Sequence, residues 1–140
     1  MIVIDPSVRA CGWAIFYGRD LESAGVVQAT DPVDLADRLA MVMHTPNHSV
    51  CLIERPRIYP HSPVPPNDIV TLGIAVGVAT ALARVRGIRV EYTYPTQLNK
   101  TVTEHRVRKV LNPDKMLKTV PKSLQHNAID AIHLGMIHVS

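Results

Sequence analysis

The stretch MIVIDPSVRACGWAIFYGRDLESAGVVQ, residues 1–28, contains three apolar, β-rich runs separated by turn residues. Runs of this kind, bounded by Gly, Pro, Asp and Ser, are typical of short β-strands. Because the turns between the runs are short, the strands should pair as an antiparallel meander. The predicted strands are residues 1–5, 10–17 and 23–28.

The remainder of the chain alternates helices with strands. Asp31 and Pro32 supply an N-cap and a first-turn proline for one helix, and Asn67 is the predicted cap of the next. The predicted elements are a helix at 31–43, a strand at 48–54, a helix at 68–86, a strand at 88–94, a basic helical region from 95 that Asn112-Pro113 breaks, and a helix at 124–139.

This order of elements predicts an α/β protein with the RNase H-like fold. A helical crossover between strands 4 and 5 requires the two strands to be parallel and the connection between them to be right-handed. We expect a central five-stranded mixed sheet of order 3-2-1-4-5, with strand 2 antiparallel and helices on its flanks. With 140 residues and 46% hydrophobic content, the chain suits one domain spanning residues 1–140.

Composition restricts the class of protein. No run of eighteen uncharged apolar residues occurs, and no basic segment followed by an apolar signal opens the chain. We therefore expect a soluble, cytoplasmic protein of a bacterium or a phage-infected cell, with no membrane partner. Cys11 and Cys51 lack CxxC spacing, which argues against a zinc knuckle or a disulfide framework and favours buried thiols.

Charge is distributed unevenly along the chain. Residues 1–50 carry three Lys/Arg against six Asp/Glu, a net −3, whereas residues 51–140 carry twelve against six, a net +6. A basic half of this kind suggests a polyanionic partner, most often nucleic acid.

Three carboxylates lie in strongly apolar segments: Asp5 and Glu54 each close a predicted strand, and Asp130 lies in a predicted buried helix. Removing an ionised carboxylate from water in such surroundings costs free energy unless a positive group lies beside it. If the three converge, oxygen ligands of this type suit Mg²⁺ or Mn²⁺. The alternative is that they are three unrelated strand-end or helix-surface acids.

Several motifs resemble those of RuvC-type Holliday junction resolvases, in the same order along nearly the whole chain. They are Ile4-Asp5-Pro6-Ser7 with Gly12-Trp13-Ala14, Leu52-Ile53-Glu54, Leu72-Gly73-Ile74-Ala75 with Gly77, the stretch Tyr94 to Val102, and Asn127-Ala128-Ile129-Asp130-Ala131. The resemblance implies a homodimer that binds four-way junction DNA and makes paired nicks with Mg²⁺ or Mn²⁺, leaving 5′-phosphates and 3′-hydroxyls, without a small-molecule cofactor.

The resemblance also implies roles for individual residues. Asp5 would bridge two ions, with Glu54 completing the shell of one and Asp130 that of the other. The family usually has an acid or a histidine about one turn before the last Asp, and here the sequence departs, since those positions hold His126 and Asn127. Either His126, as a ligand or proton-transfer group, or Asn127, as a neutral oxygen ligand, could complete the site.

Junction binding would use the basic half of the chain and a stacking aromatic. The family has an aromatic shortly after its second acid, whereas this chain has Arg57 there, so Tyr59 is a displaced candidate. The candidate DNA contacts are Arg55, Arg57, Tyr59, Lys100, Arg106, Arg108, Lys109, Lys115 and Lys118, with Lys122 in the same pool.

The helix at 68–86 is apolar on nearly every face, so we expect it to be covered on both sides. Its small residues favour close helix contact, and a dimer interface is preferred over plain core packing. The predicted interface residues are Leu72, Gly73, Val76, Gly77 and Thr80.

Two other functions stay open at this point. One is a related nuclease that acts on structured RNA or DNA flaps. The other is a junction-binding protein whose catalysis is weakened because Asn127 replaces an acid.

Overall fold

A computed structural model describes residues 1–44, 48–57, 60–61, 63–95 and 100–140. The strands are β1 (Ile2–Asp5), β2 (Cys11–Tyr17), β3 (Asp20–Val27), β4 (Val50–Glu54) and β5 (Arg89–Thr93). The helices are α1 (Pro32–Val42), α2 (Pro66–Val85), α3 (Lys100–Leu111) and α4 (Gln125–His138), with 3-10 segments η1 (Pro113–Thr119) and η2 (Lys122–Leu124).

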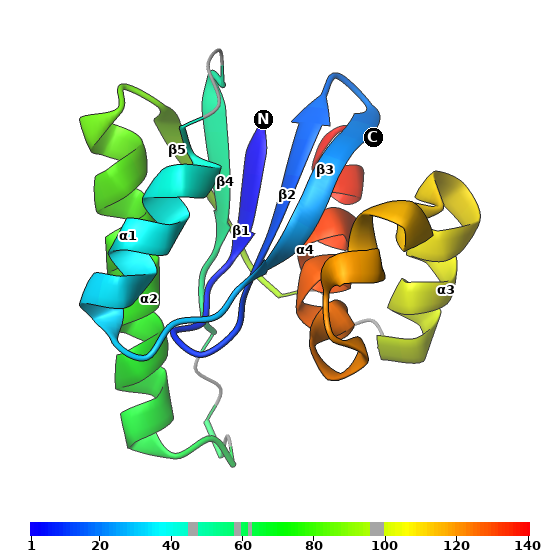
Figure 1. The fold of residues 1–140 in the computed structure, drawn as a ribbon. Coiled ribbons are helices and arrows are strands. Elements are labelled where there is room, and N and C mark those ends of the chain that lie inside the picture. The colour runs from blue at the N-terminus through cyan, green and yellow to red at the C-terminus, as the bar shows by residue number, and fades with distance from the viewer. Residues whose placement is uncertain (45–47, 58–59, 62, 96–99) are drawn as a thin grey trace.

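The five strands form one mixed sheet of order β3-β2-β1-β4-β5 (Figure 1). Strand β2 runs antiparallel to both β1 and β3, while β1, β4 and β5 are parallel to one another. The predicted strand order and directions are therefore confirmed. Helices α1 and α2 cover one face of the sheet, and α4, with α3 outside it, covers the other.

Side-chain alternation along the strands divides the core into two layers. Ile2, Ile4 and Ile53 belong to the cluster under α1 and α2, whereas Val3 and Leu52 belong to the cluster under α4. Since alternate residues of a strand share a face, the next residues of the second set are Asp5 and Glu54. Both carboxylates are therefore directed to the α4 side of the sheet.

Helix α4 packs on β2 at two glycines that allow close approach. A Cβ placed on Gly12 would lie 1.9 Å from the backbone oxygen of Asn127, and one on Gly135 would lie 2.3 Å from the Phe16 ring. Larger residues would push the helix away from the sheet. The glycines thus set the position of α4, which carries Asp130.

Several element boundaries differ from the sequence prediction by a few residues, and two of these differences have a clear physical cause. Strand β3 begins at Asp20 instead of residue 23, because Gly18 adopts a φ of 58° in a tight turn that pairs Tyr17 with Asp20. Helix α2 begins at Pro66, and Asn67 lies inside the helix and is not its N-cap. Proline at the first helical position needs no amide partner, so it starts the helix without a side-chain cap.

Helix α2 is less covered than its composition predicts. Its buried residues are Ala75, Ala79 and Ala83, while the exposed fractions of Val70 and Ile74 are 62% and 44%. Among the described residues, α2 alone is long and apolar enough to cross a membrane, by length and composition only. Cys11 and Cys51 are free and buried, as predicted.

Candidate active site

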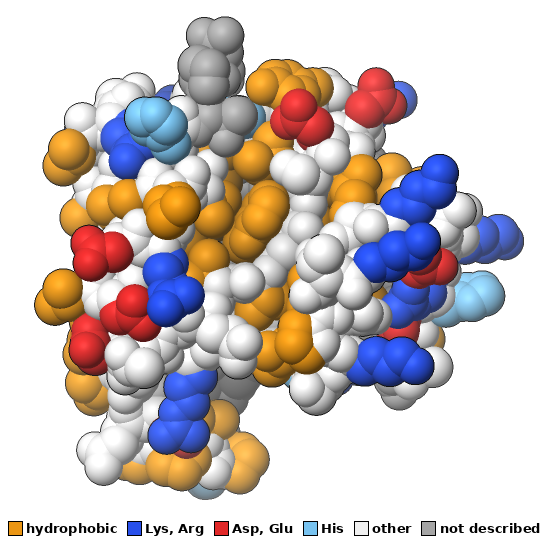
Figure 2. Space-filling view, in the orientation of Figure 1, with side chains coloured by type: hydrophobic (Ala, Val, Ile, Leu, Met, Phe, Trp, Pro, Cys, Tyr) orange, Lys and Arg blue, Asp and Glu red, His pale blue; other side chains and the backbone are white. Residues whose placement is uncertain are grey.

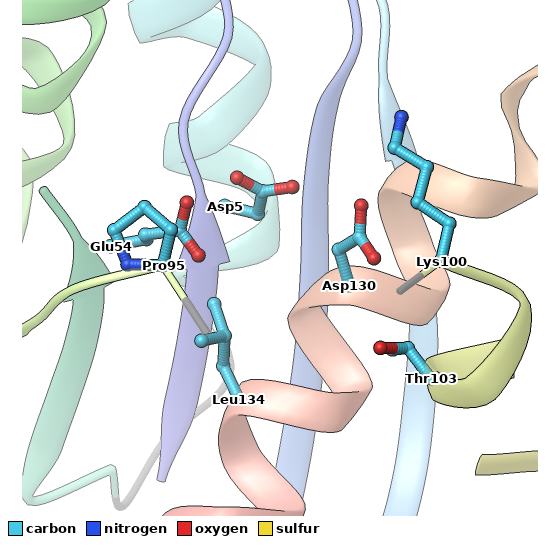
Figure 3. Close-up of a pocket in the computed structure, with 7 residues that line it drawn as sticks. All are labelled: Asp5, Glu54, Pro95, Lys100, Thr103, Asp130 and Leu134. Atoms are coloured by element: carbon cyan, nitrogen blue, oxygen red, sulfur yellow. The ribbon is translucent and has the colours of Figure 1, made fainter. Parts of the chain in front are cut away.

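Asp5, Glu54 and Asp130 line one cavity of about 200 Å³, together with Pro95, Lys100, Thr103 and Leu134. Figure 3 shows the three carboxylates directed toward the same space, from the end of β1, the end of β4 and the first half of α4. The structure thus places acids from the start, the middle and the end of the chain around a common opening.

The geometry follows from strand register. Ile4 pairs with Ile53 in the parallel β1–β4 ladder, so the residues that follow, Asp5 and Glu54, leave the sheet at the same level. The ends of parallel strands are where open α/β sheets place their sites. Asp130 faces them because Gly12 allows α4 to lie directly on β2.

Burial makes all three carboxyl groups weaker acids than usual. The pKa of Asp5 is raised well above its ordinary value, first by burial and then by the charges of Glu54 and Asp130, with Lys100 opposing. Burial and then the charge of Asp130 raise the pKa of Glu54 to about 7. Burial also raises the pKa of Asp130, although Lys100 and His126 act in the opposite direction.

Within the described residues, none of the three carboxylates accepts a hydrogen bond or forms an ion pair. Carboxylates that lose much of their hydration normally find such partners, so these half-buried groups lack compensation among the described residues. A divalent cation is a chemically suitable partner, because hard cations prefer carboxylate oxygens. In the arrangement that the structure shows, no group of three or more His, Cys, Asp or Glu among the described residues is close enough together to hold a metal ion.

Lys100 and Thr103 form the wall opposite β1. Both lie on the first turn of α3, and Thr103 is buried although it is polar. Lys100 is one of the predicted DNA contacts, whereas Thr103, Pro95 and Leu134 were not predicted as site residues. The i, i+3 spacing from Lys100 on a predicted helix was the available signal for Thr103.

His126 and Asn127 lie on α4 before Asp130, and neither lines the cavity. His126 is exposed, and it is close enough for its charge to lower the pKa of Asp130. The Asn127 amide donates to the Leu124 carbonyl oxygen over 3.3 Å. A site role for either residue stays a prediction.

Basic side chains gather over α3 and the segment that follows it (Figure 2). Arg108 differs from the rest, since it forms ion pairs with Glu104 at 2.9 Å and with Asp114. Tyr59 lies outside the described residues. The exposed predicted contacts on this side are Lys100, Arg106, Lys109, Lys115, Lys118 and Lys122.

Four of the predicted dimer residues, Gly73, Val76, Gly77 and Thr80, line a shallow groove between α2 and the edge of the sheet, together with Arg55 and Tyr92. Gly73 and Gly77 are exposed, and a Cβ at either would meet nothing within 4 Å. Leu72, Val76 and Thr80 are half-buried. A second helix could therefore approach this surface closely, and the dimer itself stays a prediction.

Comparison with known proteins finds relatives by structure and not by sequence. No protein-family model and no curated protein matches the chain. Thermus thermophilus RuvC in complex with a Holliday junction substrate superposes with a TM-score of 0.75 and 19% identity, covering 99% of this chain and 92% of that one.

Two further resolvases superpose over the same length. Fowlpox virus resolvase with its Holliday junction DNA gives a TM-score of 0.63 and 12% identity, covering 98% of each chain. The yeast mitochondrial Holliday junction resolvase Ydc2 gives 0.65 and 14%, covering 99% of this chain and 77% of that one. The protein therefore has the RNase H-like fold in the form found in RuvC and related Holliday junction resolvases.

Proposed function

We propose that this protein is a metal-dependent endonuclease that resolves four-way DNA junctions by paired phosphodiester hydrolysis. The observation that carries the proposal is the set of three half-buried carboxylates with raised pKa values around one cavity, on a fold shared with junction resolvases. Each cut would leave a 5′-phosphate and a 3′-hydroxyl.

The carboxylates would hold Mg²⁺ or Mn²⁺, in our proposal two ions per site. Glu54 and Asp130 are both acidic neighbours of Asp5, so Asp5 would hold the ions together with each of them. Bound ions would activate water and stabilise the leaving 3′ oxygen. They would also replace the repulsion among the carboxylates with attraction, which supports the assignment of these residues as ligands.

Lys100 would hold the phosphate that is to be cut. It lines the cavity, and its charge acts on both Asp5 and Asp130. A lysine here provides a point charge for a phosphate oxygen and partly offsets the acidity of the site. The basic surface over α3 and η1 would then position the adjoining duplex arm.

Paired cutting requires two sites, and the exposed side of α2 would supply the contact between two copies. Its small residues Gly73 and Gly77 leave room for a second helix. A dimer with two-fold symmetry would present two equivalent cavities to a junction whose strands are also related by symmetry.

The deciding experiment incubates the protein with a labelled four-way junction and Mg²⁺ and maps the nicks. Symmetric pairs of nicks support the proposal, and an Asp5→Asn variant serves as the catalytic control. Preferential cutting of a flap or a structured RNA at the same salt concentration would instead favour the related nuclease function.

One observation favours a junction-binding protein with weakened catalysis as the second candidate. Asn127 occupies a position where an acid is common in resolvases, and its amide bonds to its own helix instead of lining the cavity. Cleavage of a junction in the presence of Mn²⁺ would eliminate this candidate.

A further inference from the structure

Two arginines that follow β4 are stacked on two tyrosines of β5 and the residue after it. The guanidinium carbon of Arg55 lies 5.0 Å from the centroid of the Tyr92 ring, and that of Arg57 lies 5.0 Å from the centroid of the Tyr94 ring. We call Arg55, Arg57, Tyr92 and Tyr94 the arginine–tyrosine strip. Sequence analysis identified the two arginines and neither tyrosine.

The strip is built by the sheet itself. Ile53 pairs with Tyr92 in the β4–β5 ladder, and the Arg55 amide donates to the Thr93 carbonyl oxygen over 2.7 Å. Pairing thus continues past Glu54 and sets each arginine beside a tyrosine. The Tyr92 hydroxyl and the Thr80 hydroxyl of α2 are 3.0 Å apart, and this hydrogen bond holds the Tyr92 ring in place.

The strip adjoins the carboxylate cavity on both strands. Arg55 directly follows Glu54, and Tyr94 directly precedes Pro95, and both Glu54 and Pro95 line that cavity. Figure 3 shows Pro95 beside Glu54 at the cavity wall. Glu54 is directed to the α4 side of the sheet and Arg55 to the α2 side, so a nucleic acid strand that reached from the cavity to the strip would pass over the end of the sheet beside Pro95.

The four side chains of the strip are largely exposed to solvent. The exposed fractions of Tyr92 and Tyr94 are 45% and 50%, and both arginines are exposed. No acidic side chain of the described residues forms an ion pair with Arg55. Nearby Glu91 is already engaged by Arg89 at 2.7 Å and by His138 at 3.4 Å. The strip therefore offers exposed aromatic faces and, at Arg55, a positive charge that forms no ion pair with an acid of the described residues.

Stacking affects what the arginines can do. A guanidinium that lies over a ring keeps its in-plane N–H donors available, and phosphate oxygens are their preferred acceptors. Because the ring restrains the long side chain, less conformational entropy is lost when a phosphate binds. Tyrosine rings in turn can stack on unpaired bases without regard to sequence.

We propose that the arginine–tyrosine strip binds the DNA strand next to the cut site, with the arginines on its phosphates and Tyr94 against an unstacked base. This inference rests on the proposed function and adds the residues that hold the strand beside the cavity. Tyr94, the residue that follows β5, is a positioning residue, and the proposal is separate from the predicted stacking role of Tyr59, which lies outside the described residues.

The test measures binding of a fluorescent four-way junction by anisotropy at several salt concentrations, in EDTA so that the substrate stays intact. Tyr94→Leu should weaken binding about tenfold with an unchanged salt slope, because a neutral stacking contact is lost. Tyr94→Phe keeps the ring and should bind within about twofold of wild type. Arg57→Ala should weaken binding and flatten the salt slope by about one ion.

The matched control is Tyr17→Leu. Tyr17 is 45% exposed, as Tyr92 is, but it lies near the beginning of β1, at the end of that strand opposite to Asp5. Its loss should leave affinity unchanged, and thermal unfolding should show that every variant is folded. Equal affinities for Tyr94→Leu and Tyr17→Leu, or an equal loss in Tyr94→Phe and Tyr94→Leu, would overturn the inference. A wild-type protein that does not bind the junction would overturn the proposed function as well.

Discussion

Replacing Glu54 with glutamine should stabilise the metal-free protein considerably more at pH 8 than at pH 5. Burial and then the charge of Asp130 raise the pKa of Glu54 from 4.5 to about 7. A carboxyl group with a raised pKa holds its proton more tightly when folded than when unfolded. Its unfavourable contribution is therefore absent below the unfolded pKa, grows as pH rises, and is complete above the folded pKa.

The size of the effect follows from the pKa shift. At 1.36 kcal/mol per pKa unit, the raised pKa lowers the unfolding free energy by about 3 kcal/mol at pH 8, where Glu54 is ionised, and by about 1 kcal/mol at pH 5, where folding must protonate it. Solvent that reaches the cavity makes these values upper limits. Glutamine keeps the shape and removes the charge, so the difference between variant and wild type isolates this contribution.

Urea unfolding in EDTA at pH 5 and pH 8 measures the difference in unfolding free energy between Glu54→Gln and wild type. Asp34→Asn is a control of opposite sign, because the hydrogen bonds from Arg38 and Thr30 lower the pKa of Asp34 and stabilise its charged form. That variant should lose stability at both pH values. If Glu54→Gln differed from wild type by the same amount at pH 5 and pH 8, the cavity would not hold a destabilised carboxylate and the metal-site argument would fail.

The other predictions concern the metal, the phosphate, the dimer and the packing of α4. Asp5→Asn should abolish junction cleavage and leave binding in place; loss of binding in a gel-shift assay would contradict its role as a ligand. Lys100→Ala should weaken binding and flatten its salt dependence by about one ion, and an unchanged slope would exclude the contact. Gly77→Arg should convert a dimer into a monomer at micromolar concentration by light scattering, whereas a wild-type monomer would refute the interface. Gly12→Ala should lower the unfolding free energy by about 1–3 kcal/mol and reduce cleavage, since its Cβ meets the Asn127 carbonyl, and unchanged melting would contradict this.

Much of the fold and the carboxylate layout could be predicted because local signals agreed with one another. Apolar runs ending in Asp5 and Glu54 identified the ends of two strands, which the predicted strand order makes neighbours. The crossover rule required strands 4 and 5 to be parallel. Once two strands are parallel and in register, their terminal residues lie at the same edge. The position of Asp130 depends in addition on how closely α4 approaches β2, which the sequence indicates only through the small residue Gly12.

The features that sequence reasoning missed depend on pairing between strands or on chain geometry. Tyr92 and Tyr94 look like ordinary strand residues until the β4–β5 register sets them beside Arg55 and Arg57. The cap at Asn67 was wrong because a proline already fixes the backbone at the first helical position. In each case the deciding partner is distant in sequence or is the backbone itself.

The end of β4 shows how one strand can serve two surfaces. Successive residues of a strand point to opposite faces, so Glu54 faces the α4 side with the other carboxylates, while Arg55 faces α2 and lines a groove there with Gly77 and Tyr92. A register slip of one residue would send the arginine into the acidic cavity and the glutamate toward α2. The pairing of Ile53 with both Ile4 and Tyr92 prevents that slip. The same ladder that brings the acids together therefore also fixes the arginine–tyrosine strip beside them, and a variant that loosens β4 should impair cleavage and strand binding together.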